Sequence, residues 1–147
     1  MRVTGIETTK KGRYALMVDG EFAFSLHRDT FLLCPWLQKG AEVSPERLET
    51  LRQEDELRSA RERALDLLSA AEQTSGTLRQ KLLRWYGEEA VEAAVLRMEE
   101  LGLVDDEAYA RRLARDLLAR KHYPRRRLAQ ELTGKGIDHA LAEEAAA

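Results

Sequence analysis

Hydrophobic and polar residues alternate along the first 26 residues, as they do in β-strands that bury one face. The alternating segments are residues 3–8, 13–18 and 21–26. Asp19-Gly20 separates the last two segments, and Asp-Gly at such a place is a strong hairpin signal because both residues tolerate positive φ. The pattern predicts a small N-terminal antiparallel element of three strands. We expect its apolar contacts to come from Tyr14, Leu16, Phe22 and Phe24.

Residues 27–43 show neither a helical nor a strand period, and Pro35 excludes a helix through their middle. We expect their apolar side chains to form an irregular plug that completes the N-terminal element, residues 1–43. These side chains are Leu32, Leu33, Trp36 and Leu37.

Ser44-Pro45 has the residues of a helix start, because a capping hydroxyl precedes proline at the first helical position. No strong helix breaker follows before Gly76. The pattern predicts a long helix, either continuous or interrupted, that ends near residue 71. Its first part, residues 44–59, is sparsely apolar and is expected to be a helical arm or linker.

The chain then repeats itself at a spacing of 50 residues. Residues 64–82 align without gaps on residues 114–132, and seven of these nineteen positions are identical. Five of the seven are apolar residues on a helix face, which a duplicated packing unit requires. The pattern predicts two tandem three-helix repeats, residues 60–104 and 105–147, so the expected fold class is mainly α.

Each repeat is predicted to contain three helices joined by short turns. In the first repeat the first helix is expected to end near residue 71 and the second to begin at residue 74 or 75. The third helix is expected to run from residue 88 to about residue 102. In the second repeat Asp105 caps the first helix, Pro124 starts the second, and Asp138 precedes a short third helix. Trp85 and Tyr86 lie at a helix junction, where they could stack on nucleotide bases, but large aromatic side chains there more commonly anchor a core, which is the expectation here.

The formal net charge of −2 conceals a strong segregation of charge along the chain. Residues 88–107 contain eight acidic residues and one basic residue, whereas residues 109–135 contain nine basic residues and two acidic ones. The basic stretch is suited to carboxylates or phosphates, since arginine binds both through paired hydrogen bonds. For Arg111, Arg112 and Arg115, a solvated face that pairs with the neighbouring acids is an equally good explanation.

Arg125, Arg126 and Arg127 follow Pro124 in the first turn of a predicted helix. Cations there oppose the helix macrodipole at about 0.3–1 kcal/mol each, so folding alone does not favour them. Arg127 can recover part of this through Glu131, four residues later, and a partner with carboxylates or phosphates accounts for the rest. The predicted partner contacts are Arg120, Lys121, Arg125, Arg126 and Arg127, with Arg79, Lys81 and Arg84 at the matching end of the first repeat.

The sequence contains no phosphate-binding glycine loop, nucleophile elbow, paired-histidine zinc helix or cysteine pair. Its three histidines, His27, His122 and His139, fall in different predicted elements. Cys34 is the single cysteine, so an internal disulfide is excluded and a small buried filler is expected. We therefore expect no enzymatic activity, no metal and no cofactor.

Apolar stretches fall well short of the ~20 residues that cross a bilayer, and the N-terminus lacks the apolar core of a signal peptide. These features predict a cytoplasmic protein without a membrane partner. Nothing in the sequence demands a dimer, so a monomer is expected.

Several segments resemble a known family. The most specific is Glu-Glu-Leu-Gly-Leu-Val-Asp-Asp-Glu-Ala-Tyr-Ala at residues 99–110, which spans the repeat junction. Further matches are Gly12-Arg13-Tyr14, residues 18–22, residues 78–82 and residues 134–138. Over nearly its whole length the chain resembles RecX, the bacterial family that modulates the RecA recombinase.

The resemblance implies a stoichiometric regulator that acts in DNA repair, homologous recombination and the SOS response. Such a protein binds along the RecA-DNA filament and inhibits filament extension, ATP hydrolysis, strand exchange and co-protease activity. Any contact with single- or double-stranded DNA is then expected to be weak. Two alternatives stay open on the sequence alone, namely a helical module that binds single-stranded nucleic acid and a helical adaptor for another protein.

The sequence also departs from the family pattern. RecX proteins usually carry a third three-helix repeat, and we expect it to be absent here. Arg84-Trp85-Tyr86-Gly87 stands where a Lys-Gly-aromatic ending is usual, and Ala70-Ala71-Glu72 stands where arginines are usual. Contacts that depend on those positions are therefore not carried over.

Overall fold

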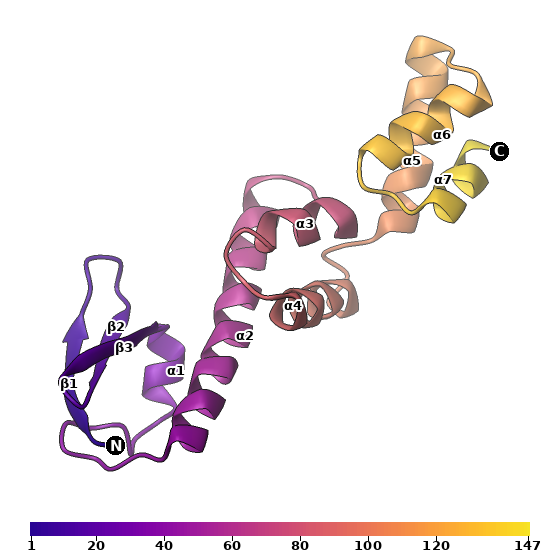
Figure 1. Cartoon of the computed structure of the whole chain (residues 1–147). Helices are drawn as coiled ribbons and strands as arrows, with labels where there is room; N and C mark the ends of the chain where they lie inside the picture. Colours follow the sequence, from indigo (N-terminus) through magenta and orange to yellow (C-terminus); the bar gives the residue numbers. More distant parts are fainter. The chain divides into compact units, whose positions relative to one another are not determined.

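The computed structural model describes the whole chain, Met1–Ala147, as a small sheet followed by helices (Figure 1). The residues form two compact units, Met1–Ser59 and Ala60–Ala147. The predicted long helix exists as α2 (Pro45–Ala70), which runs without interruption from the first unit into the second. No helix has both the length and the hydrophobicity that a membrane crossing requires.

The N-terminal sheet consists of β1 (Val3–Thr8), β2 (Tyr14–Val18) and β3 (Glu21–Leu26). The strands are antiparallel in the order β1-β2-β3, which confirms the predicted three-stranded element. Asp19 and Gly20 both have positive φ, 51° and 82°, and close the predicted hairpin.

The core of the first unit lies between the sheet, the start of α2 and the segment that joins them. Its buried residues are Val3, Leu16, Val18, Leu26, Leu37, Val43 and Leu51. The Tyr14 ring stacks on that of Phe31 in α1 (Arg28–Leu32), with ring centroids 4.2 Å apart. The connecting segment therefore does contribute to the core, through Phe31 and Leu37.

Three side chains that the sequence placed in this core are exposed: Leu32 at 61%, Leu33 at 66% and Phe22 at 61%. The short helix α1 buries Thr30, and the 100° turn per residue carries Leu32 to the opposite side. Phe22 is the second residue of β3 and lies next to the hairpin turn. The buried residue of this strand, Leu26, lies at its other end. The predicted plug was wrong for Leu32 and Leu33.

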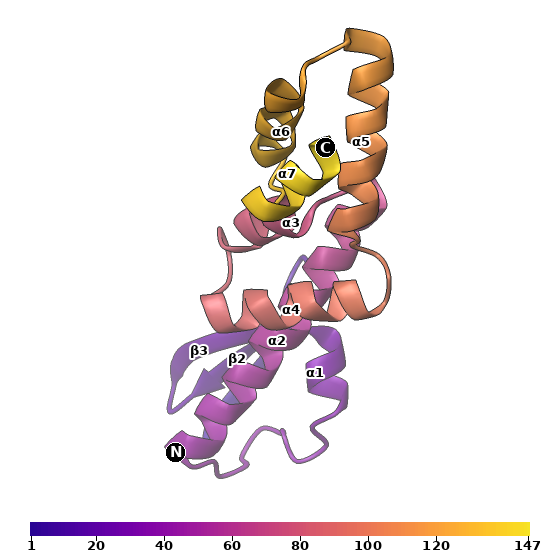
Figure 2. The same cartoon turned by 90° about the vertical axis from the view of Figure 1, so that its right-hand side faces the viewer.

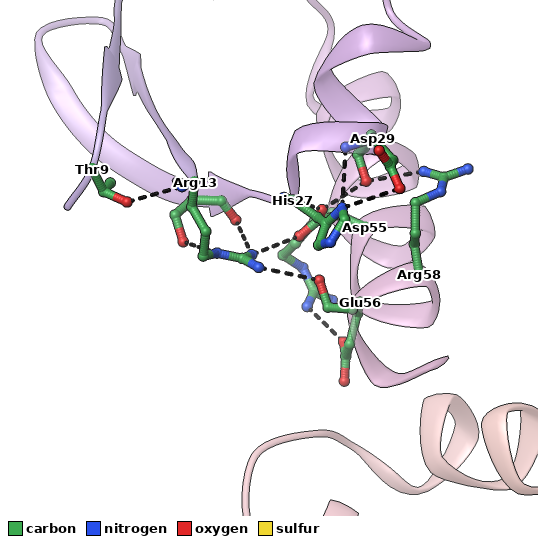
Figure 3. A network of polar contacts seen from close by, with 11 residues as sticks. Thr9, Arg13, His27, Asp29, Asp55, Glu56 and Arg58 are labelled. Atoms are coloured by element: carbon green, nitrogen blue, oxygen red, sulfur yellow. Dashed lines mark hydrogen bonds and ion pairs between the residues drawn. The ribbon is translucent and has the colours of Figure 1, made fainter. Parts of the chain in front are cut away.

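A buried carboxylate ties the elements of the first unit together (Figure 3). Asp55 of α2 accepts hydrogen bonds from the backbone N–H of His27, at 2.7 Å, and from the hydroxyl of Thr30, at 2.8 Å. Arg13 completes the network with an ion pair to Asp55 of 3.3 Å and a hydrogen bond to the Ser25 carbonyl of 2.9 Å. Because the carboxylate has three partners, its burial does not leave an unsatisfied charge.

The second unit begins with the last part of α2, followed by α3 (Ser75–Leu82) and α4 (Glu88–Glu100). Thr74 caps α3 and accepts from the N–H of Thr77, as Ser and Thr do at helix starts. The core residues of these helices are Leu78, Leu82, Val91, Ala94, Val95 and Met98.

Trp85 was expected in this core, and that expectation was wrong. Its side chain is 51% exposed, and the guanidinium of Arg63 lies 4.4 Å from the ring centroid. The helix α3 ends at Leu82, which fills the core position, and Trp85 follows beyond the last turn. Leu101 is likewise 48% exposed because α4 ends before it, and Val104 is buried instead.

The remaining helices are α5 (Asp106–Lys121), α6 (Arg125–Gly134) and α7 (His139–Ala146), which pack against one another (Figure 2). Their core is built from Ala110, Ala114, Leu132, Ile137 and Ala142. Tyr109 and Leu113 of α5 border this core, whereas Leu117 borders a second cluster formed by Leu128, Ala129 and Ala146; all three side chains are half-buried. The mainly helical fold behind a small sheet is as predicted.

Candidate partner-binding surface

The turn between α5 and α6 gathers the basic residues that the sequence singled out. His122 ends α5 in the left-handed conformation, with φ 54°, and turns the chain toward Pro124. Pro124 is the N-cap of α6 rather than its first helical residue, and no side chain caps this helix start. The first turn of α6 therefore carries three arginines and no acid.

Two of the predicted contact residues in this region already have an intramolecular partner. Arg120 forms an ion pair with Asp116, four residues earlier on α5. Arg127 lies 3.5 Å from the carboxylate of Glu131, which confirms the pairing predicted from the sequence. The Arg127 guanidinium also lies 4.4 Å from the centroid of the Tyr123 ring.

Lys121, Arg125 and Arg126 are exposed and have no acidic partner within the chain. Two of them, Arg125 and Arg126, lie beside the positive end of the α6 macrodipole. Their charges are therefore unfavourable for folding and available to an anion from outside.

The cations predicted for the first repeat divide in the same way. Arg79 pairs with Glu92 of α4, whereas half-buried Lys81 and exposed Arg84 have no acidic partner. The predicted residues therefore fall into two basic groups, one on α3 and the segment after it and the other around the α5–α6 turn.

The arginines along α5 are closer to the solvated face that the sequence allowed. Arg111 pairs with Glu107, which belongs to the neighbouring acidic stretch. Arg112 instead pairs with Glu72, outside that stretch. Arg115 donates only to the carbonyl of Arg111, at 3.5 Å.

A joint between the two repeats was missed by the sequence analysis. The Asp106 carboxylate accepts hydrogen bonds from the Ser75 backbone N–H, at 2.7 Å, and from the Ser75 hydroxyl. Thr74 donates its hydroxyl to the carbonyl of Lys135 at 2.7 Å. Helix capping explained Ser, Thr and Asp at these positions equally well, so no spacing in the sequence linked residues 75 and 106.

Neither repeat shows the arrangement of a catalytic site. His27 caps α1, His122 ends α5, and His139 lies 3.9 Å from Glu143 on α7, so the three histidines occupy separate elements. The pKa of the Cys34 thiol is raised, chiefly by burial and further by Glu54, which keeps the thiol in its poorly nucleophilic neutral form. The paired three-helix units place the chain in the class of helical-repeat proteins.

Comparison with known proteins identifies the family. Residues 60–98 match the model of the first three-helix domain of RecX, and residues 105–145 match that of the second. The regulatory protein RecX of Caldanaerobacter subterraneus subsp. tengcongensis is 31% identical over 140 residues, which cover 95% of this chain and 70% of that protein. The RecX of Levilactobacillus brevis is 33% identical over 97% of this chain and 54% of its own length.

Solved structures agree with this assignment. A crystal structure of regulatory protein RecX superposes with a TM-score of 0.66 at 29% identity, over 98% of this chain and 71% of that one. The crystal structure of RecX from Lactobacillus salivarius gives a TM-score of 0.57 at 25% identity, over 62% of this chain and 60% of that one. The chain belongs to the RecX family and is a non-enzymatic regulatory protein that modulates RecA.

Proposed function

We propose that this chain restrains RecA by binding along the RecA-DNA filament through the unpaired cations of the α5–α6 turn. The observation that carries this proposal is the exposure of Lys121, Arg125 and Arg126 without any acidic partner in the chain. Bound protein would then inhibit filament extension, ATP hydrolysis, strand exchange and co-protease activity.

The repeat architecture supports a contact that extends over more than one filament subunit. Tandem repeats present an elongated surface instead of a single pocket, and a helical filament offers the same epitope at regular intervals. We assign residues 60–104 and 105–147 as the two repeats, with Lys81 and Arg84 as the contacts of the first. Arg79, Arg120 and Arg127 contribute less, because Glu92, Asp116 and Glu131 already hold them.

Direct binding to single-stranded nucleic acid is the second candidate, and Trp85 is the observation that favours it. Its indole is half-exposed between solvent and the Arg63 guanidinium, and such a ring can stack on a base. Against it, α4 is acidic and the chain has a net charge of −2, which weakens attraction to phosphates. We therefore propose that DNA contact is weak and that the protein acts as a monomer.

The test is RecA-catalysed, single-strand-dependent ATP hydrolysis titrated with the full chain, beside binding of the same DNA without RecA. Inhibition at or below one molecule per RecA subunit, with weak DNA binding alone, is the expected result. Tight DNA binding without inhibition would favour the nucleic-acid module, whose log Kd rises by about 0.7 per contacted phosphate for each tenfold increase in salt. If the chain neither inhibited RecA nor bound DNA, the remaining candidate would be a helical adaptor for another protein.

A further inference from the structure

The internal repeat relates the first turn of α6 to a surface that is already occupied in the first repeat. At the spacing of 50 residues, Thr74-Ser75-Gly76-Thr77 at the start of α3 corresponds to Pro124-Arg125-Arg126-Arg127 at the start of α6. The α3 surface is the joint that holds the second repeat. Its contacts therefore show what this part of a repeat binds.

Two features of the neighbour fill the joint. One is a carboxylate in the first turn of a helix, because Asp106 accepts both the N–H and the hydroxyl of Ser75. The other is a glycine turn, because a β-carbon at position 76 would lie only 2.4 Å from the Gly136 carbonyl oxygen. The surface thus accepts an acidic helix start, and the close approach of the backbones depends on Gly76.

The second repeat keeps the location of this surface but changes its chemistry. Arg125 replaces Ser75, and Arg126 replaces Gly76, so no backbone can approach as closely as Gly136 approaches Gly76. Both arginines are exposed and unpaired, and their guanidinium groups reach farther than the N–H and hydroxyl of Ser75.

We propose that the first turn of α6 docks an acidic segment of a protein partner, whose carboxylates are bound by Arg125 and Arg126. This proposal rests on the proposed function and deepens it by assigning carboxylates, not DNA phosphates, as the ligand. The equivalent surface of the first repeat already takes a carboxylate. Two guanidinium groups that point to solvent can each bind one through paired hydrogen bonds.

The experiment compares the full chain with the double variant Arg125→Ala/Arg126→Ala. The matched control is Lys10→Ala/Lys11→Ala, which removes the same charge from exposed residues of the strand connection that have no acidic partner. A third variant, Arg125→Lys/Arg126→Lys, keeps the charge and removes the forked geometry. Three quantities are measured for each: half-inhibition of RecA ATP hydrolysis, binding of single-stranded DNA alone, and binding of poly-L-glutamate.

The alanine pair is expected to raise the concentration for half-inhibition about tenfold or more, since each charge-assisted hydrogen bond contributes more than a neutral one. It should weaken poly-L-glutamate binding in parallel, leave DNA binding within about twofold of the control, and retain native helicity. The lysine pair should fall between the wild type and the alanine pair.

Two results would overturn the proposal. One is that the alanine pair binds poly-L-glutamate as tightly as the Lys10→Ala/Lys11→Ala control does. The other is that the alanine pair loses DNA binding in parallel with inhibition, which would indicate that the arginines bind phosphates. A wild type that fails to inhibit RecA would remove the proposed function instead. In that case, weaker poly-L-glutamate binding by the alanine pair than by its control would still support the acidic-segment site. Equal binding by the two variants would exclude the site.

Discussion

Gly76 and Gly136 lie in direct backbone contact although sixty residues separate them, and a β-carbon at position 76 would lie 2.4 Å from the Gly136 carbonyl oxygen. This contact sets how closely the two repeats approach, because backbone atoms meet there and no flexible side chain lies between them. Thr74 adds a hydrogen bond to the carbonyl of Lys135, next to Gly136. A side chain at position 76 therefore cannot be added without a shift of one backbone.

The first prediction concerns this joint. Gly76→Ala should lower the free energy of unfolding by about 1–3 kcal/mol, because the added methyl group forces the backbones apart. Gly134→Ala is the matched control, since a β-carbon there meets no atom within 4 Å. The control should be neutral or stabilising by up to about 1 kcal/mol, as alanine is the better helix former. Urea unfolding measures both, and equal effects of the two substitutions would contradict the close contact.

The second prediction concerns the buried network of the first unit. Asp55→Ala should destabilise the protein by about 3–5 kcal/mol, because it leaves the partly buried Arg13 without its ion-pair partner and the His27 N–H without its acceptor. Glu49→Gln on the exposed side of the same helix is the control and should lower the urea midpoint far less, because it removes only an exposed ion pair. If Asp55→Ala unfolded at the same urea concentration as the control, the network would not contribute to the stability of the fold.

The third prediction uses the pKa of Glu49. The hydrogen bond from Arg52, the largest contribution, lowers the pKa of this exposed carboxyl below its ordinary value. A carboxyl with a lowered folded-state pKa stabilises the fold above its unfolded-state pKa, and that stabilisation is lost as the pH falls through the folded value. An NMR titration should place the pKa of Glu49 below the ordinary value of a glutamate carboxyl, and Arg52→Ala should return it towards that value. An unshifted Glu49 in the wild type would contradict the ion pair.

The fourth prediction concerns Cys34. Burial, with a smaller contribution from Glu54, raises the pKa of its thiol. The folded state therefore resists ionisation, so stability should fall as the pH rises above the unfolded-state value of about 8.5. Iodoacetamide should alkylate Cys34 more slowly in the native protein than in urea at pH 8, and the difference should narrow at higher pH. Equal rates in both states at pH 8 would disprove the raised pKa.

The fifth prediction separates the two kinds of leucine after β3. Leu37 is 2% exposed and Leu33 is 66% exposed. Leu37→Ala should cost about 2–5 kcal/mol of unfolding free energy, whereas Leu33→Ala should change it by less than about 0.5 kcal/mol. Thermal or urea unfolding of the two variants measures the difference, and a large loss in Leu33→Ala would restore the plug that the sequence suggested.

Local signals predicted most of the elements, because they depend on neighbouring residues alone. Asp19-Gly20 marked the hairpin, Ser44-Pro45 the start of α2, and Asp105 the cap of α5. The internal repeat predicted the helical array, because segments with the same pattern of apolar residues are expected to form helices that pack in the same way. Burial was harder to predict where an element is short, as in α1, or where a helix ends before an apolar residue, as at Trp85.

The candidate surface was only partly predictable. The sequence identified the cations and the pairing of Arg127 with Glu131, and Arg120 pairs with Asp116 at the same four-residue spacing, which was missed. The pairing of Arg79 with Glu92 depends on the packing of α3 against α4, which no spacing in the sequence shows. The family resemblance identified the regulator of RecA, whereas the assignment of contact residues stays a prediction.

The hydrogen bond from the Ser75 N–H to Asp106 also bears on how the molecule folds during synthesis. The N–H of Ser75 belongs to the first repeat, but its acceptor lies in the second, so a nascent chain that ends between them lacks this hydrogen bond. The first repeat reaches its full stability only when the second has folded beside it. Folding of the two repeats is therefore coupled, as in one-dimensional arrays whose stability depends on nearest-neighbour interfaces.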